Sequence, residues 1–91
     1  MSPAQSEATK RRRAQSLYEE AMEAYGRWDM EEAVQDLEEV LTLCPNNPSY
    51  HMSMAQALSR AGDFDRALRA LANYLRLAPD SKVADRIEQL F

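Results

Sequence analysis

Two side chains of this 91-residue sequence have the chemistry of metal ligands or nucleophiles, Cys44 and His51. Each is the only residue of its type in the chain, whereas a zinc ion needs three or four such ligands. The sequence has no glycine-rich phosphate loop, and it has no serine–histidine–aspartate set in a suitable context. The paired acids fall on predicted solvent faces of helices, where solvation is a better interpretation than general acid or base chemistry. We therefore expect no catalytic residue, no metal site, no cofactor and no enzyme.

The chain also has one run of four consecutive basic residues, Lys10, Arg11, Arg12 and Arg13. Such a run either contacts a nucleic acid or an acidic partner, or it forms the solvated start of a helix. In the second case its charges pair with Glu19 and Glu20 on the following turns. We favour the solvated start, because one cluster without interleaved aromatic residues is a small footprint for nucleic acid.

Charge is unevenly distributed along the chain, although the formal net charge is only −4. Residues 1–13 carry +3, residues 14–47 carry −8 and residues 48–81 carry +1. The acidic load therefore lies almost entirely on one segment. It disfavours nucleic acid near that surface and favours a neutral or basic partner.

The composition is that of a small globular domain, with 45% apolar and 29% charged residues. No stretch approaches the roughly 20 apolar residues that a membrane-spanning helix needs. Residues 1–13 lack the apolar core of a signal peptide, and a single cysteine forms no internal disulfide. We expect a cytoplasmic protein that does not associate with membranes.

An internal repeat determines which elements position these residues. When residues 61–81 are shifted back by 34 positions, they match residues 27–47. The matching pairs include Asp29 and Asp63, Ala33 and Ala67, Leu37 and Leu71, Leu41 and Leu75, and Pro45 and Pro79. Ala21 and Ala55, which precede the turns, are also 34 residues apart. The sequence therefore predicts two helix-turn-helix units, residues 14–47 and 48–81.

This pattern resembles the tetratricopeptide repeat family in its period, its small residues and its L-x-L-x-P endings. The first unit departs from the second at its turn, where Trp28 occupies the place of Gly62 and the glycine is two residues earlier. The resemblance implies an all-α, right-handed superhelical stack of two repeats and a C-terminal capping helix over residues 82–91. Residues 1–13 then form a polar, basic arm or a helix extension. The implied function is protein–protein interaction, with many classes of partner.

Local signals predict the helix ends. We expect the first helix to be firmly ordered from about Ala14 to Tyr25, although Ser2 with Pro3, or Ser6 three residues before Thr9, are alternative, earlier starts. Asp29, with Glu32 three residues later, forms a capping-box pattern for the second helix. The third helix is expected over residues 48–61, with Asn47 as its cap and Pro48 at its first position, and Gly62 ends it in a left-handed conformation.

Apolar spacing predicts which side chains these helices bury. The fourth helix, residues 64–77, should bury Phe64, Ala67, Leu68, Leu71, Tyr74 and Leu75. The last helix should bury Val83, Ile87 and Leu90 against it. We expect Trp28 to pack its turn against the second helix, although an exposed anchor for a partner is the alternative.

Tyr18, Met22 and Tyr25 form a second apolar stripe on the first helix, beside the stripe that contains Ala21. The resemblance implies that the first helix of each pair lines a concave groove. The expected lining is Tyr18, Met22 and Tyr25 with Ser49, Met52, Ser53, Gln56 and Ser59. This lining predicts a protein or peptide partner, neutral or basic, with apolar anchors. A homodimer, a self-assembling structural or chaperone-like protein and a nucleic-acid accessory protein remain alternatives.

Overall fold

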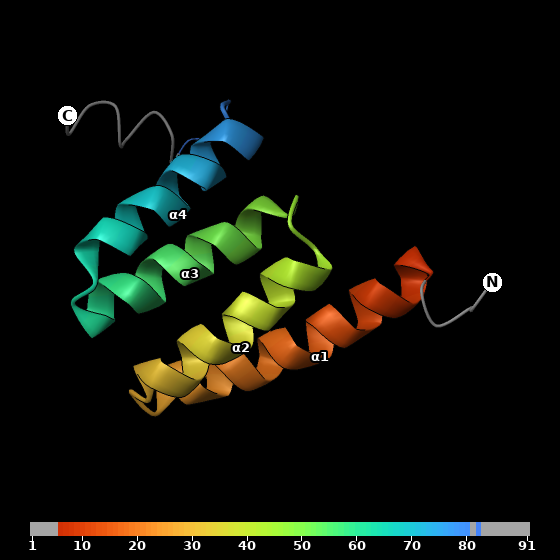
Figure 1. Ribbon diagram of the computed structural model, residues 1–91, viewed down its shortest axis with the longest axis horizontal. Coiled ribbons are helices and arrows are strands. Elements are labelled where there is room, and N and C mark those ends of the chain that lie inside the picture. Colours follow the sequence, from red (N-terminus) through yellow and green to blue (C-terminus); the bar gives the residue numbers. More distant parts are fainter. Residues whose placement is uncertain (1–5, 81, 83–91) are drawn as a thin grey trace.

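The chain is helical throughout the part that the structure describes, residues 6–80 and 82. The computed structural model contains four α-helices in these ranges: α1 (Glu7–Gly26), α2 (Met30–Leu43), α3 (Pro48–Ala61) and α4 (Phe64–Leu77). α1 pairs with α2, α3 pairs with α4, and the two hairpins stack through α2 and α3 (Figure 1). The predicted all-helical stack of two helix-turn-helix units is confirmed. The predicted capping helix over residues 82–91, with its burial of Val83, Ile87 and Leu90, lies outside the described residues except for Lys82.

The helix ends follow the predicted local signals. The Asp29 side chain caps α2 by accepting a hydrogen bond of 3.2 Å from the backbone N–H of Glu32. The Asn47 side chain caps α3, and Pro48 occupies the first helical turn, where its missing N–H has no consequence. α3 ends at Gly62, whose φ of 85° is left-handed as predicted.

α1 begins earlier than the expected onset near Ala14. Its N-cap is Ser6, whose side-chain oxygen accepts a hydrogen bond of 3.2 Å from the Thr9 N–H. The Ser6 and Thr9 hydroxyl oxygens also lie 2.9 Å apart. Residues 7–13 are therefore a regular extension of α1, because a local cap satisfies its first turn.

The α1–α2 turn uses the same backbone geometry as the α3–α4 turn without a glycine. Trp28 has a φ of 64°, where the second turn has Gly62 at 85°. In both turns the N–H of the following aspartate donates to the carbonyl five residues earlier, at 2.9 Å. This is the hydrogen-bond pattern of a Schellman cap. Gly26 is instead the last helical residue of α1.

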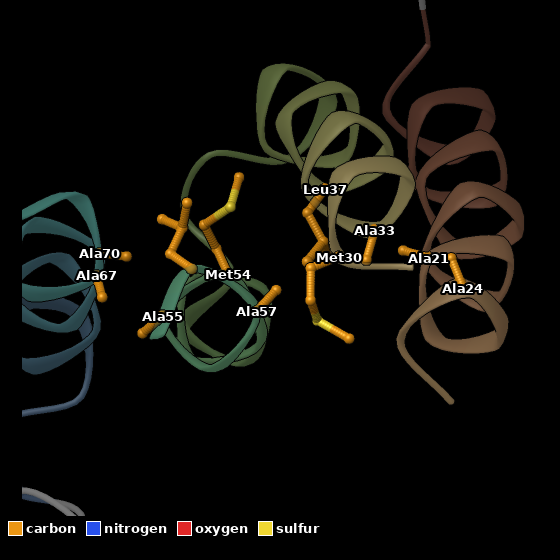
Figure 2. Packing of buried hydrophobic residues seen from close by; sticks show 11 residues of the cluster. Ala21, Ala24, Met30, Ala33, Leu37, Met54, Ala55, Ala57, Ala67 and Ala70 are labelled. Atoms are coloured by element: carbon orange, nitrogen blue, oxygen red, sulfur yellow. The ribbon is translucent and has the colours of Figure 1, made fainter. Parts of the chain in front are cut away.

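Small side chains fill most of the core between the helices (Figure 2). The main cluster contains Ala21, Ala24, Met30, Ala33, Leu37, Met54, Ala55, Ala57, Leu58, Ala67 and Ala70. A second cluster joins Ala14, Val40 and Tyr50. Alanine at these facing positions allows the helices to approach closely, and Leu37 and Val40 are the largest fully buried side chains.

α4 buries fewer side chains than its apolar spacing predicts. Phe64 is 63% exposed and Leu68 is 55% exposed, so their expected burial is wrong. Ala67 and Ala70 are buried, and Leu71 is partly buried against the main cluster. The physical reason is that α4 packs extensively only against α3, so one face of its wide apolar stripe has no opposing helix in the described part of the chain.

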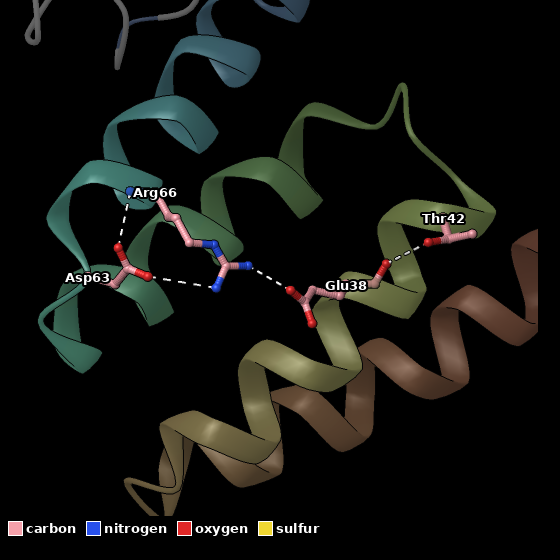
Figure 3. A network of polar contacts seen from close by, with 4 residues as sticks. All are labelled: Glu38, Thr42, Asp63 and Arg66. Carbon is pink, nitrogen blue, oxygen red and sulfur yellow. Dashed lines mark hydrogen bonds and ion pairs between the residues drawn. The ribbon is translucent and has the colours of Figure 1, made fainter.

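One polar network connects the two hairpins (Figure 3). Arg66 of α4 donates a hydrogen bond of 2.6 Å to the Glu38 carboxylate of α2, and it lies 3.7 Å from the Asp63 carboxylate. The Thr42 hydroxyl donates to the Glu38 backbone carbonyl at 2.9 Å. Because these side chains are about half exposed, the ion pair contributes only about 0–1 kcal/mol to the stability of the stack.

Candidate protein-binding surface

Tyr18, the first of the predicted groove residues, forms a contact between the two hairpins. Its Oη atom lies 2.9 Å from Oγ of Ser53 on α3, and its ring centroid lies 5.0 Å from that of Tyr50. Ser53 is buried, so it contacts Tyr18 and does not line an open groove as expected. This half-buried pair therefore contributes to hairpin stacking, and Tyr18 offers a partner only its remaining exposed edge.

The Tyr50 ring packs against the Tyr18 ring beside that hydrogen bond. Burial raises the pKa of the Tyr50 hydroxyl above its usual value, and the neighbouring Cys44 and Tyr18 raise it further. The phenol therefore stays neutral across the physiological range, and the ring is a packing element. With Tyr50 only 7% exposed, it offers no face for stacking on a ligand.

Four of the eight predicted groove residues line one open depression on the face formed by α1 and α3. Its volume is about 380 Å³, at the lower end of the range of about 300–1,000 Å³ that is typical of small-ligand sites. The lining residues are Tyr25, Met52, Ala55, Gln56, Ser59, Arg60 and Leu71. A depression of this size accommodates one or two side chains of a peptide.

Three predicted groove residues lie outside this depression besides Tyr18. Met22 is half-buried and packs against the main core cluster. Ser49 is exposed on the first turn of α3, where its N–H donates to the Asn47 side chain at 3.0 Å. Ser53 is 7% exposed and contacts Tyr18. The predicted row of eight residues therefore divides into a structural part and an accessible part.

Arg60 is the functional candidate that the sequence reasoning missed. Its guanidinium carbon lies 4.3 Å from the ring centroid of Tyr25 and 4.4 Å from that of Trp28. The expected packing of Trp28 against the second helix is wrong, because the ring is 66% exposed and contacts Arg60 of α3. The Arg60 side chain makes no hydrogen bond or ion pair within residues 6–80 and 82. Two aromatic rings therefore hold the guanidinium group in place, and its N–H donors remain available to a ligand.

A family model described as tetratricopeptide repeat matches residues 24–90, which is most of the chain. The chain belongs to the tetratricopeptide repeat family. Such repeats are in general protein–protein interaction modules and are typically non-catalytic. Searches of curated proteins and of solved structures gave no match. The match begins near the end of α1, so most of that helix, including its basic run, lies outside it.

The four basic residues of this tetratricopeptide repeat protein have different surroundings on α1. Arg13 lies 3.8 Å from the Glu39 carboxylate of α2, so the expected pairing with Glu19 and Glu20 is wrong. Arg11 and Arg12 line a second depression, of about 910 Å³, beside the α2–α3 loop. Lys10 is half-buried and lies outside that lining. Successive residues of a helix are about 100° apart, which is why a continuous run does not form one patch.

His51 and Cys44 lie close to the α2–α3 loop of the tetratricopeptide repeat. His51 is buried, and its Nε2–H donates to the Pro45 carbonyl at 2.7 Å. This bond joins α3 to the α2–α3 loop, so His51 has a structural role. The described residues contain no group of three His, Cys, Asp or Glu side chains arranged to hold a metal ion. Among the helices described here, none is sufficiently long and apolar to cross a membrane.

Proposed function

We propose that this tetratricopeptide repeat chain binds a peptide or helix of a partner protein on the face formed by α1 and α3. The observation that carries the proposal is the depression beside Tyr25, with Met52 and Leu71 as apolar lining. Gln56 and Ser59 are exposed at its edge and offer hydrogen-bonding groups. An apolar centre with a polar rim is the usual anatomy of a protein-binding site.

The lining indicates the chemistry of the segment that would bind. Met52 is flexible and polarizable, so it adapts to an aliphatic or aromatic anchor. Tyr25 contributes a large ring at low conformational cost. Arg60, fixed between Tyr25 and Trp28, can donate to a backbone carbonyl or carboxylate beside the anchor. Because the first repeat is strongly acidic, a partner that is neutral or basic overall is favoured.

The proposal is tested by selecting peptides from a random library displayed on phage against the purified chain. Met52→Ala should weaken binding of the selected peptides by about 1–2 kcal/mol, because it removes an accessible apolar contact. Met22→Ala is the matched control, since Met22 undergoes the same chemical change on the same face but lies outside the depression. Dissociation constants measured by isothermal titration calorimetry give the comparison.

Thermal melting followed by circular dichroism separates lost binding from lost folding. Met52→Ala should leave the chain folded at the temperature of the titration, because its side chain is only half-buried. Equal affinities for the parent chain and Met52→Ala would contradict the proposal. If melting shows that both variants are folded, a loss that is larger for Met22→Ala than for Met52→Ala would contradict it as well, because Met22 packs against the main core cluster.

A further inference from the structure

α1 is longer than the helix with which it pairs. It has 20 residues against 14 in α2, which makes it about 9 Å longer at a rise of 1.5 Å per residue. Its first turns extend past the C-terminal end of α2, beside the α2–α3 loop (Figure 1). The depression of about 910 Å³ lies between this overhang and that loop. We refer to it as the overhang site.

The overhang site combines an apolar floor with a basic wall. From α1 it receives Ala8, Arg11, Arg12 and Gln15, which lie at i, i+3, i+4 and i+7 on one helical face. The α2–α3 loop and adjoining helix ends provide Leu43, Cys44, Pro45, Asn46, Asn47, Pro48 and Tyr50. The charged lining residues are two arginines and Glu7. The site is thus positively charged, although the whole chain is acidic.

The two arginines of this wall have no acidic partner in the described part of the chain. Arg13, their neighbour, pairs with Glu39 across the hairpin. The Arg11 and Arg12 side chains form no ion pair or hydrogen bond with the residues described, including Glu7, one turn from Arg11. Both side chains are exposed. Guanidinium groups in this state suit carboxylates, which they bind through two parallel hydrogen bonds.

We propose that the overhang site binds an acidic segment of a partner protein that carries one large apolar side chain. The apolar side chain lies on Leu43, Pro45 and Pro48, and flanking carboxylates bind Arg11 and Arg12. This site lies on a different part of the molecule from the depression beside Tyr25, and it selects the opposite charge. It stands independently of the function proposed above.

The lining favours an acidic protein segment over nucleic acid or a second copy. Single-stranded nucleic acid is held by aromatic rings that stack on bases, and Tyr50, the aromatic ring of this site, is 7% exposed. A second copy offers α2 as its most acidic element. Leu37 and Val40 of α2 are fully buried, and Val34 and Leu41 are partly buried, so α2 supplies no fully exposed apolar anchor. The exposed Phe64 lies between Asp63 and Asp65, but the Asp63 carboxylate already binds the backbone N–H and the guanidinium of Arg66, which leaves Asp65 alone to bind an arginine.

The test uses a fluorescein-labelled peptide in which a single phenylalanine is flanked by glutamates on both sides. Two double variants of the full chain lower the charge equally: Arg11→Gln with Arg12→Gln, and Lys10→Gln with Arg13→Gln. The first should weaken binding about tenfold, because charge-assisted hydrogen bonds are lost. The second should change affinity by no more than about twofold, the effect expected of exposed charges outside the site. Fluorescence anisotropy gives both dissociation constants.

Two further variants test the apolar half of the site without changing charge. Ala8→Leu fills the depression from an exposed helical position, where leucine is a good helix former. It should weaken binding of the phenylalanine peptide, and replacing that phenylalanine by serine should weaken binding to the unmodified chain. Circular dichroism verifies that each variant folds. If a double variant does not fold, the affinity of Ala8→Leu for the phenylalanine peptide tests the proposal instead.

Four outcomes would overturn the proposal. The first is the absence of measurable binding of the phenylalanine peptide. The second is equal weakening by both double variants with no effect of serine, which indicates non-specific attraction. The third is tighter binding of an oligouridine of equal charge, which would assign the arginines to nucleic acid. The fourth is self-association of the chain that is lost in the first double variant, which would make a second copy the occupant.

Discussion

Leu37 of α2 is completely buried, whereas Leu71, 34 residues later at the matching position of α4, is only partly buried. The two leucines belong to the same position of the repeat, and their helices have the same length. They differ in their neighbours: among the described helices, α2 packs between α1 and α3, whereas α4 packs extensively only against α3. Burial in a repeat protein therefore depends on the position of a repeat in the stack as much as on its sequence.

The turns of the two hairpins have the same backbone conformation but different side chains. Trp28 occupies the left-handed position that Gly62 occupies in the second turn. A left-handed conformation costs a residue with a Cβ roughly 1–2 kcal/mol. In return, the Trp28 ring contacts Arg60 at the edge of the candidate binding depression. The first turn thus carries a local strain that the second avoids, and such strain is common at functional sites.

The largest expected effect comes from truncating the two matched leucines. Leu37→Ala should lower the free energy of unfolding by about 3–5 kcal/mol, because it leaves a cavity in a fully enclosed part of the core. Leu71→Ala should lower it by about 1–2 kcal/mol, because its side chain is already partly in contact with water. Urea denaturation followed by circular dichroism measures both values. Equal losses would mean that α4 is as enclosed as α2 in solution.

A smaller effect is expected from substituting the residue with left-handed backbone conformation in each of the two turns. Gly62→Ala should lower the free energy of unfolding by about 1 kcal/mol, entirely through backbone strain, since a Cβ there meets no atom within 4 Å. Trp28→Gly should raise it by about 0.5 kcal/mol, because relief of strain exceeds a lost cation–π contact of about 0.5–1 kcal/mol.

Circular dichroism is again the suitable probe, because Trp28 is the only tryptophan in the chain and its removal abolishes the usual fluorescence signal. A loss of stability in Trp28→Gly similar to that in Gly62→Ala would contradict the strain argument. In that case the contact between Trp28 and Arg60 would be worth more than the conformational cost.

The helix ends and the repeat could be predicted because they depend on residues close in sequence. Asp29 and Asn47 lie directly before the helices that they cap, and Gly62 lies directly after one. The exposure of Phe64 could not be predicted in this way, because it depends on which helix lies opposite α4. The position of Arg60 also escaped prediction. It contacts Tyr25 across two helices, and no local spacing rule joins residues 35 positions apart.

The overhang site illustrates the same limit. The basic run is evident in the sequence, but the separate surroundings of its four side chains could not be predicted from it. The side chains separate only after α1 has a definite start at Ser6 and a definite neighbour in Glu39 of α2. Arg11 and Arg12 then face the loop while Arg13 faces the hairpin. The extension of α1 through residues 7–13, packed beside α2, therefore decides which charges act together.

The smallest expected effect concerns Asp36, which the second repeat replaces with the buried Ala70. Desolvation raises the pKa of the Asp36 carboxyl above its ordinary value, and the charges of Glu32 and Glu39 raise it further. A raised folded-state pKa means that ionised Asp36 opposes folding at neutral pH. As the pH falls through that pKa, the folded state takes up the proton before the unfolded state does, and the penalty disappears.

Asp36→Asn removes this charge while keeping a similar helix propensity. At pH 7 it should raise the free energy of unfolding by about 0.2–0.5 kcal/mol, the size of like-charge effects between residues three or four apart on a helix. The advantage over the parent chain should shrink as the pH falls through the raised pKa of Asp36, because both chains are then uncharged at this position. Urea denaturation at a series of pH values measures the difference. An advantage that stays constant or grows at low pH would show that the gain comes from packing or hydrogen bonding by the amide. The acidic face of the first repeat would then be no less compatible with folding than the neutral position in the second.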